Sequence, residues 1–420
     1  MRRSVTIREY RTKEQVQLSQ EELLSLRHLT AGKLGITPSG QPGRYDLTAT
    51  SWIGALEVGD LRIVIRPKIE IGQVLFLLSY ALDPKAFRSE RFPFAPDDSL
   101  LETVVPGFAR SLKQALGRGL LQGYRTKEES LSTLRGRVRF DDQIRRRLGL
   151  FPPAEVTYDD FTEDIEENRI LKAALSRLAL TRIRSRLARI SLQEFNQSLE
   201  RVTLVEYHPH QLPATIFSRL NEHYRPALTL AKLILQTSSF ELKHGRIRSS
   251  AFLVDMNDVF ENFVVIALRE ALGLSNRTFP QGDKDRMPRP LYLDEARRVH
   301  LKPDLSWWEH GRCCFVGDVK YKIVKGKAHN PDLYQLLSYL TATALPWGVL
   351  VYAQGPSQGM KHFVSTAGKT LEVIPLDLTQ SPDRLLLSVE GLAERIASTK
   401  LGSAGSGRGP MLATSHAVAS

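Results

Sequence analysis

The chain has 420 residues, of which 42% are hydrophobic and 25% charged, a composition typical of a globular protein with about two to three domains. Lysine and arginine outnumber aspartate and glutamate by 58 to 46, which favours a polyanionic partner such as DNA or RNA. The longest apolar run, 74–82, is too short to span a bilayer, and no apolar segment of a signal peptide follows the basic N-terminus. We therefore expect a soluble, cytoplasmic protein whose adjacent Cys313 and Cys314 stay reduced.

Residues 1–95 predict a strand-rich N-terminal module. Ser19 and Glu22 have the spacing of a capping box, which predicts the start of a helix. Two apolar runs on either side of Gly59-Asp60 predict a hairpin, and the run 74–82 predicts a helix that covers the sheet.

Residues 99–243 predict a mainly helical, basic middle region with a strand-like interruption at 134–140. A helix is expected over 166–188, and the acid-rich residues 159–167 are interpreted as its entry, favoured by the helix dipole, rather than as a cation site. Two interpretations stay open for the arginine runs: a solvated face, or a contact with nucleic acid or a partner. These runs include Arg135, Arg137, Arg139, Arg145, Arg146 and Arg147.

Residues 246–398 alternate strands with helices, which predicts an α/β domain. Asp255 is placed to cap a helix with an apolar stripe, and Asn330 to cap a second helix that begins with Pro331. Between these helices, the turn His310-Gly311 separates two strands.

The end of the chain predicts a strand buried on both faces at 347–353 and a closing hairpin at 362–376. Residues 399–420 lack apolar periodicity and predict a disordered tail. The expected fold class is α+β multidomain, with a strand-rich N-terminal module, a helical middle region and a C-terminal α/β domain.

Gly368-Lys369-Thr370 resembles the end of a phosphate-binding loop, but Phe363 stands where that loop needs glycine, and a strand rather than a helix follows. We therefore expect this chain to bind no nucleotide. The ten histidines show no metal-ligand spacing.

Asp318, Lys320 and Lys322 alternate along an expected strand, so the three side chains share one face. If the two strands pair as a hairpin about His310-Gly311, Asp304 comes near Asp318. Two adjacent carboxylates repel unless a cation lies between them, and oxygen ligands with room for water suit Mg²⁺. Lys320 would then reach the same pocket and act on a metal-bound water that attacks a phosphodiester.

Three further side chains strengthen this nuclease hypothesis. Glu261 stands on a helix otherwise devoted to apolar packing, and Gln335 and Tyr339 share one helical face. The alternatives are a surface salt bridge for Glu261 and plain polar decoration for Gln335 and Tyr339.

The stretches DMNDVFENFV, LKPDL, GDVKYKIV and NPDLYQLLSYL resemble the motifs of the McrC family, the nuclease subunits of the McrBC modification-dependent restriction system. GDLRIVIRPKI, LRGRVRF and FTEDIEENRILKAAL extend the resemblance upstream, so that it covers nearly everything except the tail. It implies a PD-(D/E)xK nuclease domain with Asp304, Asp318 and Lys320 catalytic, and Glu261 and Gln335 supporting the site. The expected metal ligands are Asp304, Asp318 and Glu261, with Mn²⁺ able to replace Mg²⁺.

The resemblance also implies a separate AAA+ GTPase partner of the McrB type that recognises 5-methylcytosine-modified, double-stranded DNA and translocates it. The expected function is thus that of the Mg²⁺-dependent endonuclease subunit. Two alternatives remain: a nuclease of the same fold that acts in DNA repair or end processing without a GTPase ring, and a non-catalytic adaptor that stimulates a motor.

Overall fold

The computed structural model describes residues 3–87, 100–181, 183–209, 211–241, 249–282, 284–323, 329–354 and 359–405. Within these ranges the chain is a mixed α+β protein with several small sheets, which confirms the α+β part of the predicted fold class. Backbone contacts divide it into two compact units, Met1–Asp255 and Met256–Ser420. The predicted boundaries near residues 95 and 243 lie outside the described residues, so that finer division stays a prediction.

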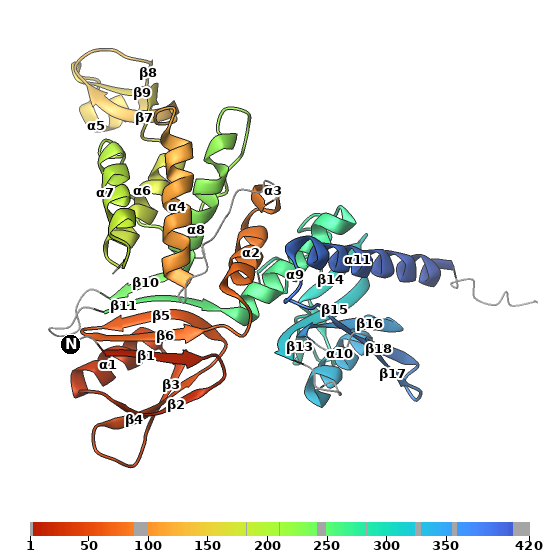
Figure 1. Ribbon diagram of the computed structural model, residues 1–420. Helices are drawn as coiled ribbons and strands as arrows, with labels where there is room; N and C mark the ends of the chain where they lie inside the picture. Colours follow the sequence, from red (N-terminus) through yellow and green to blue (C-terminus); the bar gives the residue numbers. More distant parts are fainter. Residues whose placement is uncertain are drawn as a thin grey trace, which may run out of the picture. The chain divides into compact units, whose positions relative to one another are not determined.

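A five-stranded sheet in the order β1-β6-β5-β11-β10 forms the base of the first unit (Figure 1). Strands β5 and β6 are the predicted hairpin, with Gly59 at a φ of 58° in the turn between them. Strand β11 pairs antiparallel with β5, so residues 249–255 complete a sheet that the N-terminus begins. The strands are β1 (Arg3–Arg8), β5 (Trp52–Val58), β6 (Leu61–Arg66), β10 (Ser238–Glu241) and β11 (Ser249–Asp255).

Helix α1 (Gln20–Thr30) begins with the predicted capping box. The Ser19 hydroxyl accepts a hydrogen bond of 3.1 Å from the Glu22 N–H, and the Glu22 carboxylate accepts one of 2.8 Å from the Ser19 N–H. Strand β2 (Thr12–Gln17) precedes this helix in the chain, and β3 (Leu34–Pro38) and β4 (Arg44–Ala49) follow it. The three strands form an antiparallel sheet in the order β2-β4-β3.

Helix α8 contacts α2, α4 and α6, and helix α7 packs on α4 and α6. The prediction of one helix over 166–188 is wrong. Helix α6 ends at Ala179, and Ser185 starts a new helix because its hydroxyl accepts a hydrogen bond from the Ala188 N–H at 3.2 Å. The helices are α2 (Ile71–Leu82), α3 (Pro84–Phe87), α4 (Leu100–Leu116), α6 (Glu166–Ala179), α7 (Arg186–Ser198), the 3₁₀ helix η1 (Glu222–Tyr224) and α8 (Arg225–Thr237).

A small antiparallel sheet, β7-β9-β8, interrupts this helical region more extensively than the sequence predicts. Strand β7 pairs with β9 over nine residues, yet it was not predicted because its sequence, GYRTKEESL, lacks apolar alternation. The elements are β7 (Gly123–Leu131), β8 (Arg137–Val138), α5 (Phe140–Arg147) and β9 (Ala154–Thr162).

Several arginines of the middle region form ion pairs within this small sheet. Arg135 lies 3.1 Å from Asp160, and Arg147 lies 3.3 Å from Glu155. Arg139 pairs with Glu128 at 2.9 Å. Carboxylates of the same unit therefore neutralise part of the positive charge of the arginine runs, for which a nucleic-acid contact was one of the two interpretations.

The second unit is built on a five-stranded sheet in the order β14-β15-β16-β18-β17 (Figure 1). The three central strands are parallel, and the two edge strands pair antiparallel. Strand β16 is buried through six consecutive residues, as predicted. The strands are β12 (Leu291–Tyr292), β13 (His300–Leu301), β14 (Leu305–Glu309), β15 (Arg312–Ile323), β16 (Trp347–Gln354), β17 (Met360–Val364) and β18 (Lys369–Pro375).

Helices cover both faces of this sheet. Leu336 and Leu340 of α10 pack with Val316 and Leu350 on one face, and Phe260 of α9 contacts the Tyr321 ring from the other. The helices are α9 (Met256–Leu272), α10 (Asn330–Thr343) and α11 (Pro382–Gly405).

Two local predictions for the second unit need correction. The N-cap of α10 is His329 rather than Asn330, because the first helical residue is Asn330 itself. Helix α11 continues to Gly405, so residues 399–405 are helical, and the rest of the predicted tail lies outside the described residues. The hairpin turn predicted in place of a phosphate-binding loop is confirmed, since Gly368 has a φ of 61° between β17 and β18.

Across the described residues, no helix combines the length and the apolar character that a membrane crossing requires. Both cysteines are free thiols, as predicted.

Candidate active site

A bulge in the β14–β15 hairpin sets the register of the two predicted aspartates. Next to the turn, Glu309 pairs with Arg312, but the register shifts between Trp307 and Trp308 so that Leu305 pairs with Gly317. Without that shift, Asp304 would lie opposite Gly317. The bulge therefore places Asp304, directly before β14, across from Asp318.

Asp304, Asp318 and Lys320 meet at this point. The Oδ2 atom of Asp304 accepts a hydrogen bond of 2.9 Å from the backbone N–H of Val319. The Lys320 ammonium forms an ion pair with Asp318 Oδ2 and lies 4.0 Å from Asp304 Oδ2. Asp318 has no exposed surface, and the Lys320 side chain is 22% exposed, so the lysine lies between the buried carboxylate and solvent.

Burial shifts the pKa values of the charged side chains at this site. Burial, reinforced by the charge of Asp318, raises the pKa of Asp304 to about 7. Burial also raises the pKa of Asp318 above its usual range, despite the neighbouring ammonium. For Lys320, burial opposes the charged form, but Asp318 and Asp304 outweigh it and raise the pKa of the ammonium. The paired carboxylates are therefore under-neutralised, because one cation faces two acids.

The donor set fits a small divalent cation. Both Asp318 oxygens are buried without a hydrogen bond of ordinary geometry to a described residue, although Oδ2 is in close contact with the Lys320 ammonium. A hard cation between Asp318 and Asp304 would add a second positive charge to this pair of carboxylates. Among the described residues no group of three or more His, Cys, Asp or Glu side chains lies close enough to hold a metal, so water or substrate oxygens would complete the coordination.

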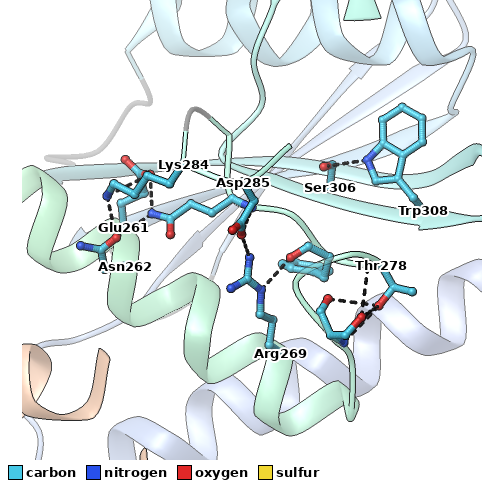
Figure 2. A network of polar contacts seen from close by, with 11 residues as sticks. Glu261, Asn262, Arg269, Thr278, Lys284, Asp285, Ser306 and Trp308 are labelled. Atoms are coloured by element: carbon cyan, nitrogen blue, oxygen red, sulfur yellow. Dashed lines mark hydrogen bonds and ion pairs between the residues drawn. The ribbon is translucent and has the colours of Figure 1, made fainter. Parts of the chain in front are cut away.

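Glu261, on α9, lies in a polar network beside this site (Figure 2). Gln281 donates from Nε2 to Glu261 Oε1 at 2.8 Å and to Asn262 Oδ1 at 2.7 Å. Lys284 donates to Asn262 Oδ1 at 2.6 Å and lies 3.9 Å from Glu261. Burial and the charge of Asp304 raise the pKa of Glu261, so this carboxylate is close enough to Asp304 to interact electrostatically.

Gln335 is linked to the segment before Asp304 through Tyr339. Its amide donates to the Tyr339 hydroxyl at 2.7 Å, and that hydroxyl donates to the Lys302 carbonyl at 3.1 Å, two residues before Asp304. The shared helical face of Gln335 and Tyr339 is thus real. These two hydrogen bonds connect α10 to the segment before Asp304.

The sequence reasoning missed Asp332, in the first turn of α10. This buried carboxylate accepts hydrogen bonds from Lys322 at 2.9 Å and from the Tyr352 hydroxyl at 2.6 Å. Lys322, the third charge on the alternating face of β15, therefore ties that strand to α10. An acid at the start of the helix was visible, but its partner on β16 was not.

Gln281 and Lys284 were missed as well. They lie in an irregular segment whose sequence has neither a helical nor a strand period. Its hydrogen bonds to α9 could not be foreseen.

The fold and the site together define a two-unit α+β protein with a centre of two paired aspartates and a lysine. Over residues 47–353 the chain matches the family described as McrBC 5-methylcytosine restriction system component. The match spans more than half of the chain, and the chain belongs to this family. No curated protein sequence matches the chain.

The fold of the chain is similar to that of a solved structure. The half-complex refined from a tetradecameric assembly of Thermococcus gammatolerans McrB AAA+ hexamers with bound McrC contains a similar chain, with 21% identity and a TM-score of 0.53. The similarity covers 94% of this chain and 100% of that one, so the two share a fold of the McrC type. A chain of the cryo-EM structure of the Thermococcus gammatolerans McrBC complex is 21% identical with a TM-score of 0.39, over 64% of this chain and 88% of that one.

Proposed function

We propose that this chain is the nuclease subunit of a modification-dependent restriction system and cuts double-stranded DNA with the help of Mg²⁺. The observation that carries the proposal is the juxtaposition of Asp304, Asp318 and Lys320 across the bulged hairpin. Together with the mixed sheet between helices, this arrangement supports a nuclease domain of the PD-(D/E)xK type in residues 256–398.

The chemistry follows from these three side chains. Asp304 and Asp318 would hold Mg²⁺ with one oxygen each or more, leaving positions for water and a phosphate oxygen. Bound Mg²⁺ would offset the negative charge that grows on the phosphate during hydrolysis. Lys320, held by the two carboxylates, would orient the attacking water or a phosphate oxygen toward the same point. Burial of Asp318 keeps this charge arrangement fixed before substrate binds.

Glu261 and Gln335 have supporting roles in this proposal. Glu261 would bind a water of the metal, and Gln281 holds the Glu261 carboxylate in place. Gln335 and Tyr339 fix the backbone before Asp304 through the Lys302 carbonyl. We expect Glu261→Gln and Gln335→Ala to lower cleavage less than substitution of Asp304, Asp318 or Lys320.

The partner in this proposal is an AAA+ GTPase of the McrB type that recognises methylated DNA. The similar chain from Thermococcus gammatolerans comes from an assembly of McrB AAA+ hexamers with bound McrC. Gly368 ends the turn before β18, and Lys369 and Thr370 are strand residues, which supports the proposal that a partner hydrolyses the nucleotide.

Co-expression with the McrB-type GTPase encoded nearest to this gene tests the proposal. A pull-down should recover both chains, and the complex should cut methylated DNA in the presence of GTP and Mg²⁺ but leave unmethylated DNA intact. Cleavage of both DNAs without a GTPase would favour a repair or end-processing nuclease. A complex that stimulates GTP hydrolysis and never cuts would indicate a non-catalytic adaptor.

A further inference from the structure

The irregular segment between α9 and β14 is fixed to the body of the second unit. The Arg269 side chain donates to the Phe279 carbonyl at 2.7 Å and forms an ion pair with Asp285 (Figure 2). The backbone N–H of Trp308, on β14, donates to the Thr278 carbonyl at 2.7 Å. This segment therefore presents its side chains at defined positions, although it contains almost no regular structure.

The same segment lies directly against the candidate active site. A Cβ atom at Gly282 would lie 3.3 Å from the Pro303 carbonyl oxygen and 3.8 Å from Asp304 Oδ1. Gly282 also lines a pocket of about 320 Å³ together with Arg286, His300 and Lys302. One wall of this pocket is thus shared with the backbone that positions Asp304.

A second pocket lies next to the first. It has a volume of about 600 Å³ and is lined by Arg289, Arg297 and Arg312, among others. Pro290 lines both pockets, so they adjoin. We refer to the two pockets together as the basic groove.

Basic residues outnumber acidic ones in the segment that lines the basic groove. Residues 284–302 contain six Lys and Arg against three Asp and Glu. Of the three acids, Asp285 forms an ion pair with Arg269, and Asp294 accepts hydrogen bonds from the backbone N–H groups of Arg298 and Val299. Asp294 and the third acid, Glu295, also line the larger pocket. Four arginines of the groove are exposed and form no ion pair with a described residue: Arg286, Arg289, Arg297 and Arg312.

We infer that the basic groove binds the sugar-phosphate backbone of the DNA strand that is cut, leading it from Arg312 past Arg286 to Asp304. Several exposed arginines along hollows beside the proposed catalytic residues offer separate contacts to successive phosphates, which suits a nucleic-acid strand better than a single small anion. This inference rests on the proposed function. It names the surface that holds the substrate beside the catalytic residues.

Two double variants of the full-length chain test this inference. Arg286→Ala/Arg289→Ala removes two groove arginines. Arg277→Ala/Arg384→Ala removes two arginines of the same unit that are exposed, line neither pocket and form no ion pair with a described residue. Binding of a short fluorescein-labelled DNA duplex is measured by anisotropy in EDTA, so that no DNA is cut, over a series of KCl concentrations. Cleavage by the complex with the GTPase and Mg²⁺ is measured in parallel.

The groove variant should bind DNA more weakly, and its slope of log affinity against log salt should fall by roughly two, because each phosphate contact contributes about 0.9. The control should keep the wild-type slope, and both variants should keep the wild-type Tm. Equal loss of DNA affinity in both variants, no loss in either, or no DNA binding by the wild-type chain would overturn the inference. A groove variant that binds DNA normally and loses only its binding to the GTPase would overturn it as well. Cleavage by the wild-type complex separates these outcomes from failure of the proposed function, which would appear as no cleavage at all.

Discussion

The carboxylate of Asp304 accepts a hydrogen bond of 2.9 Å from the backbone N–H of Val319. Val319 lies between Asp318 and Lys320, so this bond fixes Asp304 relative to both of the other proposed catalytic residues. The donor is a main-chain group, and its position depends on the pairing of β14 with β15. The geometry of the site is therefore set by strand register as much as by the side chains themselves.

Gly317→Ala should disturb that register. A Cβ atom at Gly317 would lie 2.9 Å from the Val349 carbonyl oxygen and 3.2 Å from Leu305 Cδ1, so β15 would have to move away from both neighbours. Overpacking of this kind costs about 1–3 kcal/mol. We expect a lower Tm in thermal unfolding and a clear loss of DNA cleavage.

Gly391→Ala is the matched control for Gly317→Ala. Gly391 is exposed in α11, with open space around its Cα, and alanine is favoured over glycine in a helix by up to about 1 kcal/mol. This variant should keep full activity and a Tm equal to or above the wild-type value. Equal behaviour of the two variants would argue against a strict requirement for close strand approach at Gly317.

Asp318→Asn should stabilise the metal-free protein. Asp318 is fully buried beside Asp304. Removing the free-energy cost of this buried carboxylate should raise the free energy of unfolding by roughly 1–3 kcal/mol. Burial raises the pKa of Asp304 to about 7 and that of Asp318 in the same direction. The folded state therefore binds more protons than the unfolded state from about pH 4 to 7, and wild-type stability falls as the pH rises through this window.

Thermal unfolding in EDTA at pH 5 and pH 8 measures this effect. The gain in Tm from Asp318→Asn should be larger at pH 8 than at pH 5. Glu270→Gln, at an exposed position of α9 without an ion pair to a described residue, should show no such gain at either pH. A lower Tm for Asp318→Asn at pH 8 would mean that Asp318 stabilises the fold.

The sequence predicts the central part of this site because its signals are local. Period-two alternation placed Asp318 and Lys320 on one face, and the turn at His310-Gly311 brought Asp304 near Asp318. The bulge between Trp307 and Trp308 was not predicted, although it is the feature that corrects the register. The alternation of apolar and polar residues in the strand gives no sign of where an extra residue forms a bulge.

Contacts that join distant elements were beyond prediction for a different reason. Asp332 accepts a hydrogen bond from Tyr352, whose strand is separated from α10 by a turn. Neither residue, taken alone in the sequence, indicates that the two side chains interact. The network of Gln281 with Glu261 depends on a segment without periodicity. The small sheet of β7 and β9 was missed because neither face of β7 is apolar enough to mark it as a strand.

Metal dependence is the next prediction. A site whose proposed protein ligands are two carboxylates should accept Mg²⁺ or Mn²⁺, while Ca²⁺ should bind without supporting turnover. Cleavage assays after dialysis against EDTA, with each metal added back, test this. Cleavage that persists after complete chelation would contradict a metal-dependent mechanism.

The two compact units should have different activities. All proposed catalytic residues lie in Met256–Ser420, while β11 belongs to the sheet of the first unit, so fragments are best divided after Asp255. We expect residues 1–255 to bind the GTPase and stimulate GTP hydrolysis without cutting DNA. Residues 256–420 should fold but cut poorly without the motor. GTPase rates and pull-downs with each fragment measure this, and binding by the second fragment alone would reverse the assignment.

DNA cleavage by Lys320→Ala in complex with the McrB-type GTPase is the most direct measurement of the central claim, that Asp304, Asp318 and Lys320 form a phosphodiester-cleaving centre. Removal of one preorganised charged group of this kind lowers a reaction rate by at least roughly 10²-fold. We predict such a loss for Lys320→Ala, with normal complex formation and GTP hydrolysis, and the same loss for Asp304→Ala and Asp318→Ala. Undiminished cleavage by the Lys320→Ala complex would contradict the account.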